Sequence, residues 1–337
     1  MKLLVIIVNY GTPRHVLTGL EALLPLLRKI NTSTSTSSKS QNTAECWVVD
    51  NCSPDQSVTT IQDTININSY QDCVQLMLAA KNGGFGAGNN IAIKKALLLK
   101  QPPDYFYLLN PDAIVMPGTI EKMIKHLDDN ELTGAVGGPL LDHNGNIECG
   151  AFRLPNLRGT IEEHLRLGPV SKLWRKYRVP ISPPPEVPTS VGWVSGASIM
   201  LRRTCLEKTG LFDEGFFLYF EEVDLCRRIQ DQDYQVHYLP DAEVFHEAGA
   251  STGLNVASVR LPHYWHASRS RYLEKAFGKM GLFTHNIVTV LAASLGWVYG
   301  LIRRRPVSRP HFIWDLVRYN FGTRPSEYPN NNKSDVD

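Results

Sequence analysis

The sequence predicts an α/β protein: a doubly wound, mainly parallel sheet with helices on both faces, followed by a C-terminal helical region. Three observations favour this class. Short apolar runs typical of buried strands alternate with segments whose leucines recur at helical spacing. That alternation indicates parallel strands joined by crossover helices. Several apolar runs also end in a polar residue, which places those residues at one edge of the sheet, where ligands bind in such folds.

The first half contains four strand–helix pairs. Strands are expected at 3–9, 46–49, 74–78 and 105–109, and helices at about 14–30, 57–66, from the turn at 82–90 to 100, and 118–129. The segment 31–43 is a polar, low-complexity loop. Asn9, Asp50, Asn82 and Asp112 follow the strands and are expected to lie together at the ligand-binding edge.

The second half is less regular. A strand and hairpin are expected at 134–155, with a turn at Asn144 and Gly145, and then a basic, proline-rich excursion over the site at 156–190. The chain is expected to continue with a strand at 191–201, helices at about 203–209 and 222–231, a strand at 235–238, and a helix at about 260–277.

The composition is that of a folded protein. The chain has 337 residues, 43% hydrophobic and 20% charged, enough for one large or two smaller domains. A net charge of +2 gives no whole-chain argument for nucleic-acid binding. Six cysteines lack CxxC spacing, which argues against a zinc site and favours buried thiols in a reducing compartment. The first strand begins without a signal-peptide pattern, so we expect a cytoplasmic location.

The apolar run 216–220 ends in three carboxylates, Glu221, Glu222 and Asp224. Carboxylates at the end of a buried run are costly unless they are paired, metal-bound or catalytic. Glu221 and Glu222 are candidate general bases, because an apolar pocket raises the pKa of a carboxylate toward neutrality. Asp224 stands four residues before Arg228, a spacing that favours an ion pair within one helix.

Two other motifs follow apolar runs. The turn 82–90 lacks the dinucleotide-binding fingerprint, because Ile91 stands where a third glycine is needed. It either admits a ligand close to the backbone or is a tight strand-to-helix turn. Asp112, after Asn110 and Pro111, suits a divalent cation that bridges phosphates, or caps a helix. His246 follows another apolar run and joins this set.

In this order the motifs resemble the family 2 glycosyltransferases of the GT-A fold, and among them the rhamnosyltransferase-like branch. The resemblance covers residues 3 to about 280. It rests on five groups of residues: 5–10 together with 48–53; 82–90; 109–112; 193–197 together with 221–225; and 246–251. It implies an inverting, metal-dependent enzyme that moves a sugar, rhamnose first, from a nucleotide-sugar to a hydroxyl in cell-surface polysaccharide synthesis. Two positions depart from the family pattern: Asn110 replaces a metal-binding aspartate, and Glu222 replaces the usual aspartate base.

The resemblance also implies a role for each candidate residue. Donor binding falls to Asn9, Tyr10, Asp50, Asn51, Asn82, Gly84, Phe85, Gly88, Asn89, Asn110 and Asp112. Glu222 is the implied base, with Glu221 its competitor, and Asp112 and His246 are the implied ligands of Mg²⁺ or Mn²⁺. Acceptor binding falls to Trp193, Gly196, Arg269 and Arg271, although Trp193 also suits a core position and the arginines a solvated helix face.

The expected domains follow from the same comparison of motifs. A GT-A catalytic domain is expected at 1–260, with nucleotide-sugar binding at about 1–130 and the acceptor and base region at about 131–260. A helical region is expected at 261–325 and a disordered tail at 326–337. The expected partners are dTDP-rhamnose or a UDP-sugar and a saccharide or lipid-linked acceptor, with no nucleic acid.

Residues 282–302 have about the length needed to cross a bilayer but include His285 and Asn286. Three interpretations stay open: a spanning helix, an interfacial helix followed by the arginines 303–305, and a structural helix. Basic residues at 153–178 and in the tail suit either an anionic membrane surface or a solvated face. The expected location is the inner face of the cell membrane.

Two other functions remain open at this stage. A sugar-phosphate nucleotidyltransferase needs a glycine-rich, basic triphosphate loop after the first strand, and residues 9–13 are not one. A non-catalytic, membrane-associated carbohydrate-binding protein is excluded only if nucleoside diphosphate is released in the presence of metal and acceptor.

Overall fold

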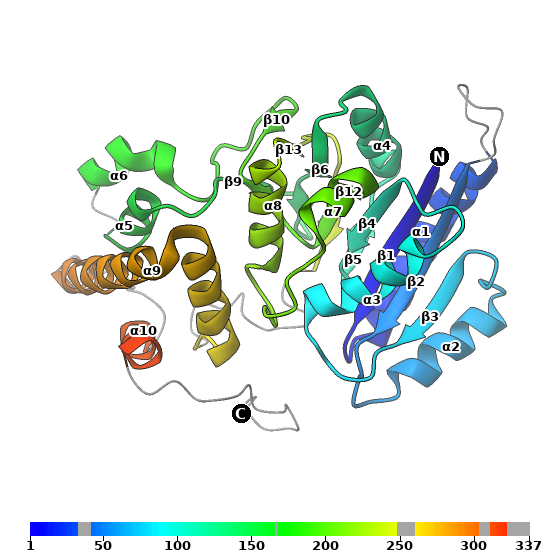
Figure 1. Ribbon diagram of the computed structural model, residues 1–337, viewed down its shortest axis with the longest axis horizontal. Coiled ribbons are helices and arrows are strands. Elements are labelled where there is room, and N and C mark those ends of the chain that lie inside the picture. The colour runs from blue at the N-terminus through cyan, green and yellow to red at the C-terminus, as the bar shows by residue number, and fades with distance from the viewer. Residues whose placement is uncertain (33–41, 166–167, 248–259, 303–310, 322–337) are drawn as a thin grey trace.

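A computed structural model describes residues 1–32, 42–165, 168–247, 260–302 and 311–321. Figure 1 shows a twisted sheet flanked by helices, with a C-terminal helical region beside it. Most of the polar loop at 31–43, the Gly249 and Ser251 positions of the His246 motif, the arginines 303–305 and the tail at 326–337 lie outside the described residues.

The main sheet has eight strands in the order β10-β13-β6-β12-β4-β1-β2-β3. These are β1 (Lys2–Asn9), β2 (Thr43–Asp50), β3 (Val74–Leu78), β4 (Tyr105–Leu109), β6 (Thr133–Gly137), β10 (Thr189–Ser190), β12 (Ser198–Arg202) and β13 (Gln235–Tyr238). β1 is parallel to β2 and β4, and β2 is parallel to β3. β12 runs antiparallel to both of its neighbours, β4 and β6. The predicted mainly parallel sheet is therefore confirmed, with an antiparallel strand in its middle.

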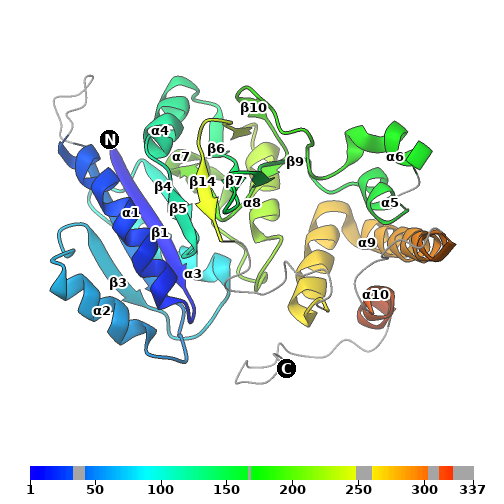
Figure 2. The same cartoon turned by 180° about the vertical axis from the view of Figure 1, so that it is seen from behind.

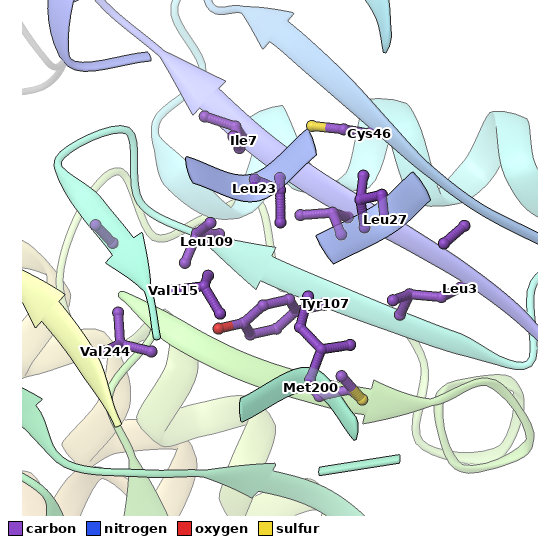
Figure 3. Close-up of a cluster of buried hydrophobic side chains, with 14 of the residues drawn as sticks. Leu3, Ile7, Leu23, Leu27, Cys46, Tyr107, Leu109, Val115, Met200 and Val244 are labelled. Carbon is purple, nitrogen blue, oxygen red and sulfur yellow. The ribbon is translucent and has the colours of Figure 1, made fainter. Parts of the chain in front are cut away.

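Helices cover both faces of the sheet, also as predicted. They are α1 (Pro13–Thr32), α2 (Ser57–Ile67), α3 (Phe85–Leu97), α4 (Thr119–Asp129), α7 (Arg203–Thr209) and α8 (Glu221–Asp231). Alternate residues of β1 contribute to two separate cores, because side chains of a strand point to opposite faces. One core packs against α1, α2 and α4 (Figure 2), and the other against α3, α7 and α8 (Figure 1). Figure 3 shows part of the first core, including Leu23 and Leu27 of α1 and Ile7 of β1.

Two small sheets complete the part of the chain that contains the main sheet. β5 (Ala113–Val115), β14 (Val244–His246), β7 (Leu140–Leu141) and β8 (Ile147–Cys149) form one, and β9 (Ala151–Phe152) pairs with β11 (Trp193–Val194) in the other. The hairpin between β7 and β8 turns at Gly145, the position that the sequence predicts. The φ of this glycine is 77°. The strand expected at 191–201 is divided between β11 and β12.

The segment 156–190 corrects an expectation. Its first part is helical, with α5 (Leu157–Leu165), α6 (Gly168–Trp174) and a 3-10 turn, η1 (Arg175–Tyr177). Two of its basic side chains have partners: Arg178 pairs with Glu162, and the Arg158 guanidinium lies 4.6 Å from the centre of the Tyr177 ring. α5 packs against α9 (His263–Ile302), so these helices belong to the C-terminal helical region and do not cover the sheet edge.

The C-terminal region is built on α9, which bends at Gly278. This glycine has φ 71° and ψ 177°, a conformation that side-chain-bearing residues rarely adopt. The first part of α9 (263–277) contains the helix predicted at about 260–277, and the second part (279–302) leaves it at an angle (Figure 1). α10 (Phe312–Phe321) packs against α9.

Candidate active site

The ends of β1 and β2 form one wall of the site. Asn9 and Asp50 are in register, and the Asn9 side-chain amide donates to an Asp50 carboxylate oxygen over 2.8 Å. The amide and hydroxyl of Ser53 donate to the same carboxylate over 2.9 and 2.7 Å. Asn9 and Asp50 are both buried, whereas Tyr10 is 37% exposed. Asp50 therefore organises the two loops, and Tyr10 is the more accessible side chain.

The glycine-rich turn joins this wall to the acidic stretch. Gly84 has φ 86°, and a Cβ added there would lie 1.7 Å from the Phe217 carbonyl oxygen. That carbonyl accepts a hydrogen bond of 3.1 Å from the Phe85 amide. A Cβ at Gly88 would lie 2.6 Å from Val8, so this glycine lets α3 pack closely on β1. The turn thus brings two distant segments of the chain together.

Three asparagines support the same turn. The Asn51 side-chain amide donates to the Asn82 side chain over 2.8 Å and to the Gly84 carbonyl over 3.1 Å. The Asn89 amide donates to the Phe85 carbonyl over 3.0 Å. The side-chain oxygens of Asn51 and Asn89 are buried and accept no hydrogen bond from the residues that the structure describes. Such oxygens are costly to bury, so these two suit hydrogen-bond donors from water or a ligand.

A candidate metal centre lies where β5 meets β14. Their pairing sets His246 opposite Ala113, next to Asp112. His246 Nε2 lies 3.3 Å from Asp112 Oδ1 and 3.3 Å from Asn110 Nδ2. Asp112 is only 7% exposed, and none of the described residues donates a hydrogen bond to its Oδ1. A buried carboxylate oxygen beside an imidazole nitrogen fits a divalent cation.

This pair would supply only part of a coordination sphere. Within the described ranges, no group of three or more His, Cys, Asp or Glu side chains gathers in a way that would hold a metal ion. A cation at Asp112 and His246 would therefore need other oxygens, which diphosphate and water provide in sites of this kind.

Glu221 and Glu222 begin α8 after a left-handed turn. Tyr219 and Phe220 have φ values of 68° and 69°, an uncommon conformation for bulky residues and one that sets the direction of the helix. Burial raises the pKa of Glu222 to about 7. Burial, and then the charge of Glu222, raise the pKa of Glu221 well above its usual value. Glu221 is 3% exposed, whereas Glu222 is partly accessible.

Glu222 lies on a wall that connects with the candidate metal centre. A Cβ at Gly196 would lie 3.3 Å from the Phe85 ring and 3.5 Å from Glu222 Cβ, so these three residues are neighbours. The next residue, Ala197, accepts a hydrogen bond of 2.9 Å from the Asn110 amide. The short segment 196–197 thus links the accessible carboxylate to the turn that carries Asp112.

Asp224 is the helix ion pair that the sequence predicts. Its carboxylate is 2.9 Å from Arg228 Nε and 2.8 Å from Lys275 Nζ. Lys275 was not predicted, because it comes from α9, about fifty residues further along the chain. The buried charge of Asp224 is therefore balanced, unlike those of Glu221 and Glu222.

Three expected acceptor residues are already engaged within the protein. The Trp193 ring stacks on Phe152 with centroids 3.9 Å apart. Arg269 is 7% exposed and donates to Asn286 and Thr289 over 2.7 and 2.8 Å, and burial lowers its pKa to about 10. Arg271 makes an ion pair of 2.8 Å with Asp213. Arg269 thus joins the two parts of α9, which corrects the expectation that it contacts the acceptor.

Sequence reasoning missed an aromatic group beside the acidic stretch. The Tyr264 ring lies 5.5 Å from the Phe217 ring and 6.3 Å from the Tyr219 ring, to which it is nearly parallel. Ser268 donates to the Leu218 carbonyl over 2.9 Å. The aromatic run before Glu221 was visible in the sequence, but its contact with α9 depends on tertiary structure.

The sheet order, the antiparallel β12 and the polar edge define a GT-A fold. Two solved structures share it, the mannosyltransferase PcManGT from Pyrobaculum calidifontis in complex with GDP-Man and Mn²⁺ and GalNAc-T7 with UDP, GalNAc and Mn²⁺. The first has a TM-score of 0.52 at 14% identity, over 90% of this chain and 74% of the other. The second has a TM-score of 0.53 at 15% identity, over 91% of this chain and 59% of the other.

The chain belongs to glycosyl transferase family 2, whose model matches residues 5–176. It is 32% identical over 204 residues to the N-acetylglucosaminyl-diphospho-decaprenol L-rhamnosyltransferase of Mycobacterium tuberculosis, covering 57% of this chain and 64% of that protein. It is 27% identical over 168 residues to rhamnosyltransferase WbbL of Escherichia coli, covering 49% and 61%. Each match spans less than two thirds of the relative. The resemblance seen in the motifs is confirmed.

Proposed function

We propose that this chain is an inverting, metal-dependent glycosyltransferase that moves a sugar from a nucleotide-sugar to a hydroxyl of a saccharide or lipid-linked glycan in cell-surface polysaccharide synthesis. The observation that carries the proposal is Glu222, a partly accessible carboxylate with a pKa of about 7. It lies beside Gly196, and the next residue, Ala197, is hydrogen-bonded to the turn that carries Asp112, the neighbour of His246. The two rhamnosyltransferase relatives favour rhamnose, hence dTDP-rhamnose, ahead of a UDP-sugar.

In this proposal the donor lies over the first half of the chain, at about 1–130. Tyr10 and the loops organised by Asn9 and Asp50 contact the nucleoside. The buried side-chain oxygens of Asn51 and Asn89 accept hydrogen bonds from the nucleotide-sugar. The acceptor lies over 131–260, between Gly196 and the acidic stretch. Gly84 and Phe85 hold these two regions together through Phe217, while Gly88 lets α3 pack on β1 within the first region.

The candidate cation is Mg²⁺ or Mn²⁺. Asp112 and His246 would hold it, with Asn110 beside them. Bound there, such a cation stabilises the negative charge that develops on the leaving nucleoside diphosphate.

Glu222 acts on the acceptor. It removes the proton from the acceptor hydroxyl while that oxygen bonds to the anomeric carbon on the face opposite the diphosphate. The bond between the anomeric carbon and the diphosphate oxygen breaks, so the configuration inverts. The negative charge of Glu222 raises the pKa of Glu221, so the pair disfavours a second negative charge.

Reaction at the inner face of the cell membrane suits a lipid-linked acceptor. Membership of glycosyl transferase family 2 favours this function over a nucleotidyltransferase and over a non-catalytic carbohydrate-binding protein.

The test is Glu222→Gln, which keeps the shape of the side chain but cannot accept the proton. We expect transfer to fall by at least about 10²-fold while donor binding stays within a factor of about two. Glu221→Gln and the exposed Glu186→Gln are parallel variants, and the second should behave as wild type. Activity is measured as nucleoside diphosphate release from dTDP-rhamnose and UDP-sugars with Mg²⁺ or Mn²⁺. Near-normal release by Glu222→Gln would show that another group is the base.

A further inference from the structure

The second part of α9 exposes an apolar stripe. Met280, Phe283, Ile287, Leu291 and Leu295 recur every three or four residues, which places them on one side of the helix, and they are 38–75% exposed. The stripe continues to the end of the helix through Trp297, Val298, Leu301 and Ile302, which are 47–74% exposed.

The opposite side of this helix is buried, yet it is polar and small. His285, Asn286 and Thr289 are 1–3% exposed, and Ala292 and Ala293 lie beside them. Asn286 and Thr289 accept hydrogen bonds from the buried Arg269. A surface helix of a water-soluble protein has the reverse arrangement, with its apolar side inward. This distribution indicates that the outer side of the helix meets an apolar medium.

α10 enlarges the exposed apolar surface. Trp314 is 63% exposed and Phe321 is 46% exposed. The Phe321 ring meets the Phe283 ring edge-on with centroids 6.1 Å apart, so the two helices share one surface. We call this surface the apolar face; it comprises Met280, Phe283, Ile287, Leu291, Leu295, Trp297, Val298, Leu301, Ile302, Trp314 and Phe321. Contiguous apolar surface of this kind marks an interaction site.

The charges around the apolar face favour an anionic bilayer as its occupant. The sequence from 280 to 302 contains no Asp, Glu, Lys or Arg, and it lies between Lys279 and the arginines 303–305. Basic residues at the ends of an apolar helix attract anionic lipid headgroups. If a second copy of the chain covered the stripe, the basic residues at the helix ends of the two copies would lie near one another. The stripe has no acidic residues to balance these charges, so they would repel. Trp297 and Trp314 also suit the headgroup region, where tryptophan is enriched.

α9 is long and apolar enough to cross a membrane, but the way it packs against other helices does not suit a membrane-spanning helix. A Cβ at Gly296 would lie 2.0 Å from the His164 carbonyl oxygen, so α5 lies directly on the inner side of the helix. α5 carries Arg158, Glu162 and Glu163. A spanning α9 would carry these charged residues into the hydrocarbon layer, at a large cost in free energy.

We propose that the apolar face lies in the interface of an anionic bilayer, with the second part of α9 and α10 resting on the membrane without crossing it. The inference deepens the proposed function and rests on it for the nature of the acceptor. The first part of α9 is tied to the acidic stretch by Ser268 to Leu218 and by Lys275 to Asp224. The membrane-bound face and Glu222 therefore belong to one packed unit, which suits an acceptor sugar carried on a lipid.

The test is flotation of the full chain with phosphatidylcholine vesicles, with and without phosphatidylglycerol. Leu291→Glu with Leu295→Glu replaces two exposed side chains in the middle of the stripe. The matched control, Leu98→Glu with Leu132→Glu, changes side chains that are 87% and 63% exposed in the catalytic half. We expect wild type and control to float with anionic vesicles, and the stripe variant to bind at least about tenfold less.

Three results would overturn the inference. One is wild-type chain that stays at the bottom of the gradient with anionic vesicles. Another is a dimer without lipid that the stripe substitutions abolish, because the occupant would then be a second copy. The last is wild-type chain that resists alkaline extraction from vesicles, which indicates a span. Transfer to a short soluble saccharide tests the proposed function separately, since the stripe variant should retain it.

Discussion

Glu222 differs from the other carboxylates of the acidic stretch in what surrounds it. Asp224, two residues later, meets Arg228 and Lys275, whereas one oxygen of Glu222 is buried and has no hydrogen-bond donor in the described part of the chain. The first turn of a helix stabilises negative charge, so position alone would lower the pKa of Glu222. Burial outweighs that effect and brings the pKa to about 7. A single turn of helix thus contains a carboxylate held in two ion pairs and a carboxyl whose pKa is about 7.

This pKa predicts the pH dependence of transfer. A general base works only when deprotonated, so kcat/KM should rise about tenfold per pH unit below about 7 and level off above it. Rates are measured across this range with donor, acceptor and metal held constant, and with metal binding checked at each pH. A profile that is flat from about pH 5.5 to 8.5 would contradict the assignment, because it would mean that the base has an ordinary carboxyl pKa.

At the scale of elements, the glycine-rich turn is the contact that unites the two halves of the site. Its backbone approaches the Phe217 carbonyl more closely than any side chain would permit. The same turn that resembles a ligand-binding motif therefore has a structural role as well. Of the two interpretations of this turn in the sequence, the structure shows the tight strand-to-helix turn, and ligand binding by its backbone stays a prediction.

Gly84→Ala should therefore lower the free energy of unfolding by more than the positive φ of this residue alone would cause. Gly145 provides the matched control, because it also has positive φ but has nothing within 4 Å of an added Cβ. We expect Gly145→Ala to cost about 1–2 kcal/mol in unfolding free energy. Gly84→Ala should cost roughly 1–3 kcal/mol more, and should reduce transfer, because the alanine methyl collides with Phe217. Urea unfolding measures both variants, and equal losses would mean that the turn moves aside without strain.

Local sequence patterns were sufficient to predict the strands and the positions of the polar residues that follow them. Asn9 and Asp50 lie side by side because parallel strands end at one edge, a consequence of alternation along the chain. Patterns were insufficient where a partner is distant in sequence. The basic residues at 158 and 178 suggested a solvated loop, but their partners are Tyr177 and Glu162 in a helical region. Likewise, no local signal pairs Arg269 with Asn286 and Thr289 across the bend at Gly278.

On the scale of the whole molecule, the proposed donor and acceptor sites belong to different halves of the chain that share one sheet. β12, from the second half, lies between β4 and β6, and it pairs with β4 over its full length. We therefore expect a ligand bound at the ends of β1, β2 and β4 to stabilise both halves of the sheet against unfolding.

Nucleoside diphosphate with metal should raise the melting temperature of the chain. At about 100 times Kd a ligand adds about 2.7 kcal/mol, which corresponds to several degrees for a domain of this size. We expect dTDP or UDP with Mg²⁺ or Mn²⁺ to shift Tm, Asp112→Ala to remove the metal-dependent part of that shift, and Glu222→Gln to retain it. The two substitutions should differ in their effect on the Tm shift because their residues lie on different walls of the site. Asp112 pairs with His246, whereas Glu222 lies beside Gly196. Scanning fluorimetry with a chelator control makes the measurement. If Asp112→Ala kept the full shift, the metal would bind elsewhere, and if Glu222→Gln lost it, the carboxylate would belong to the donor site.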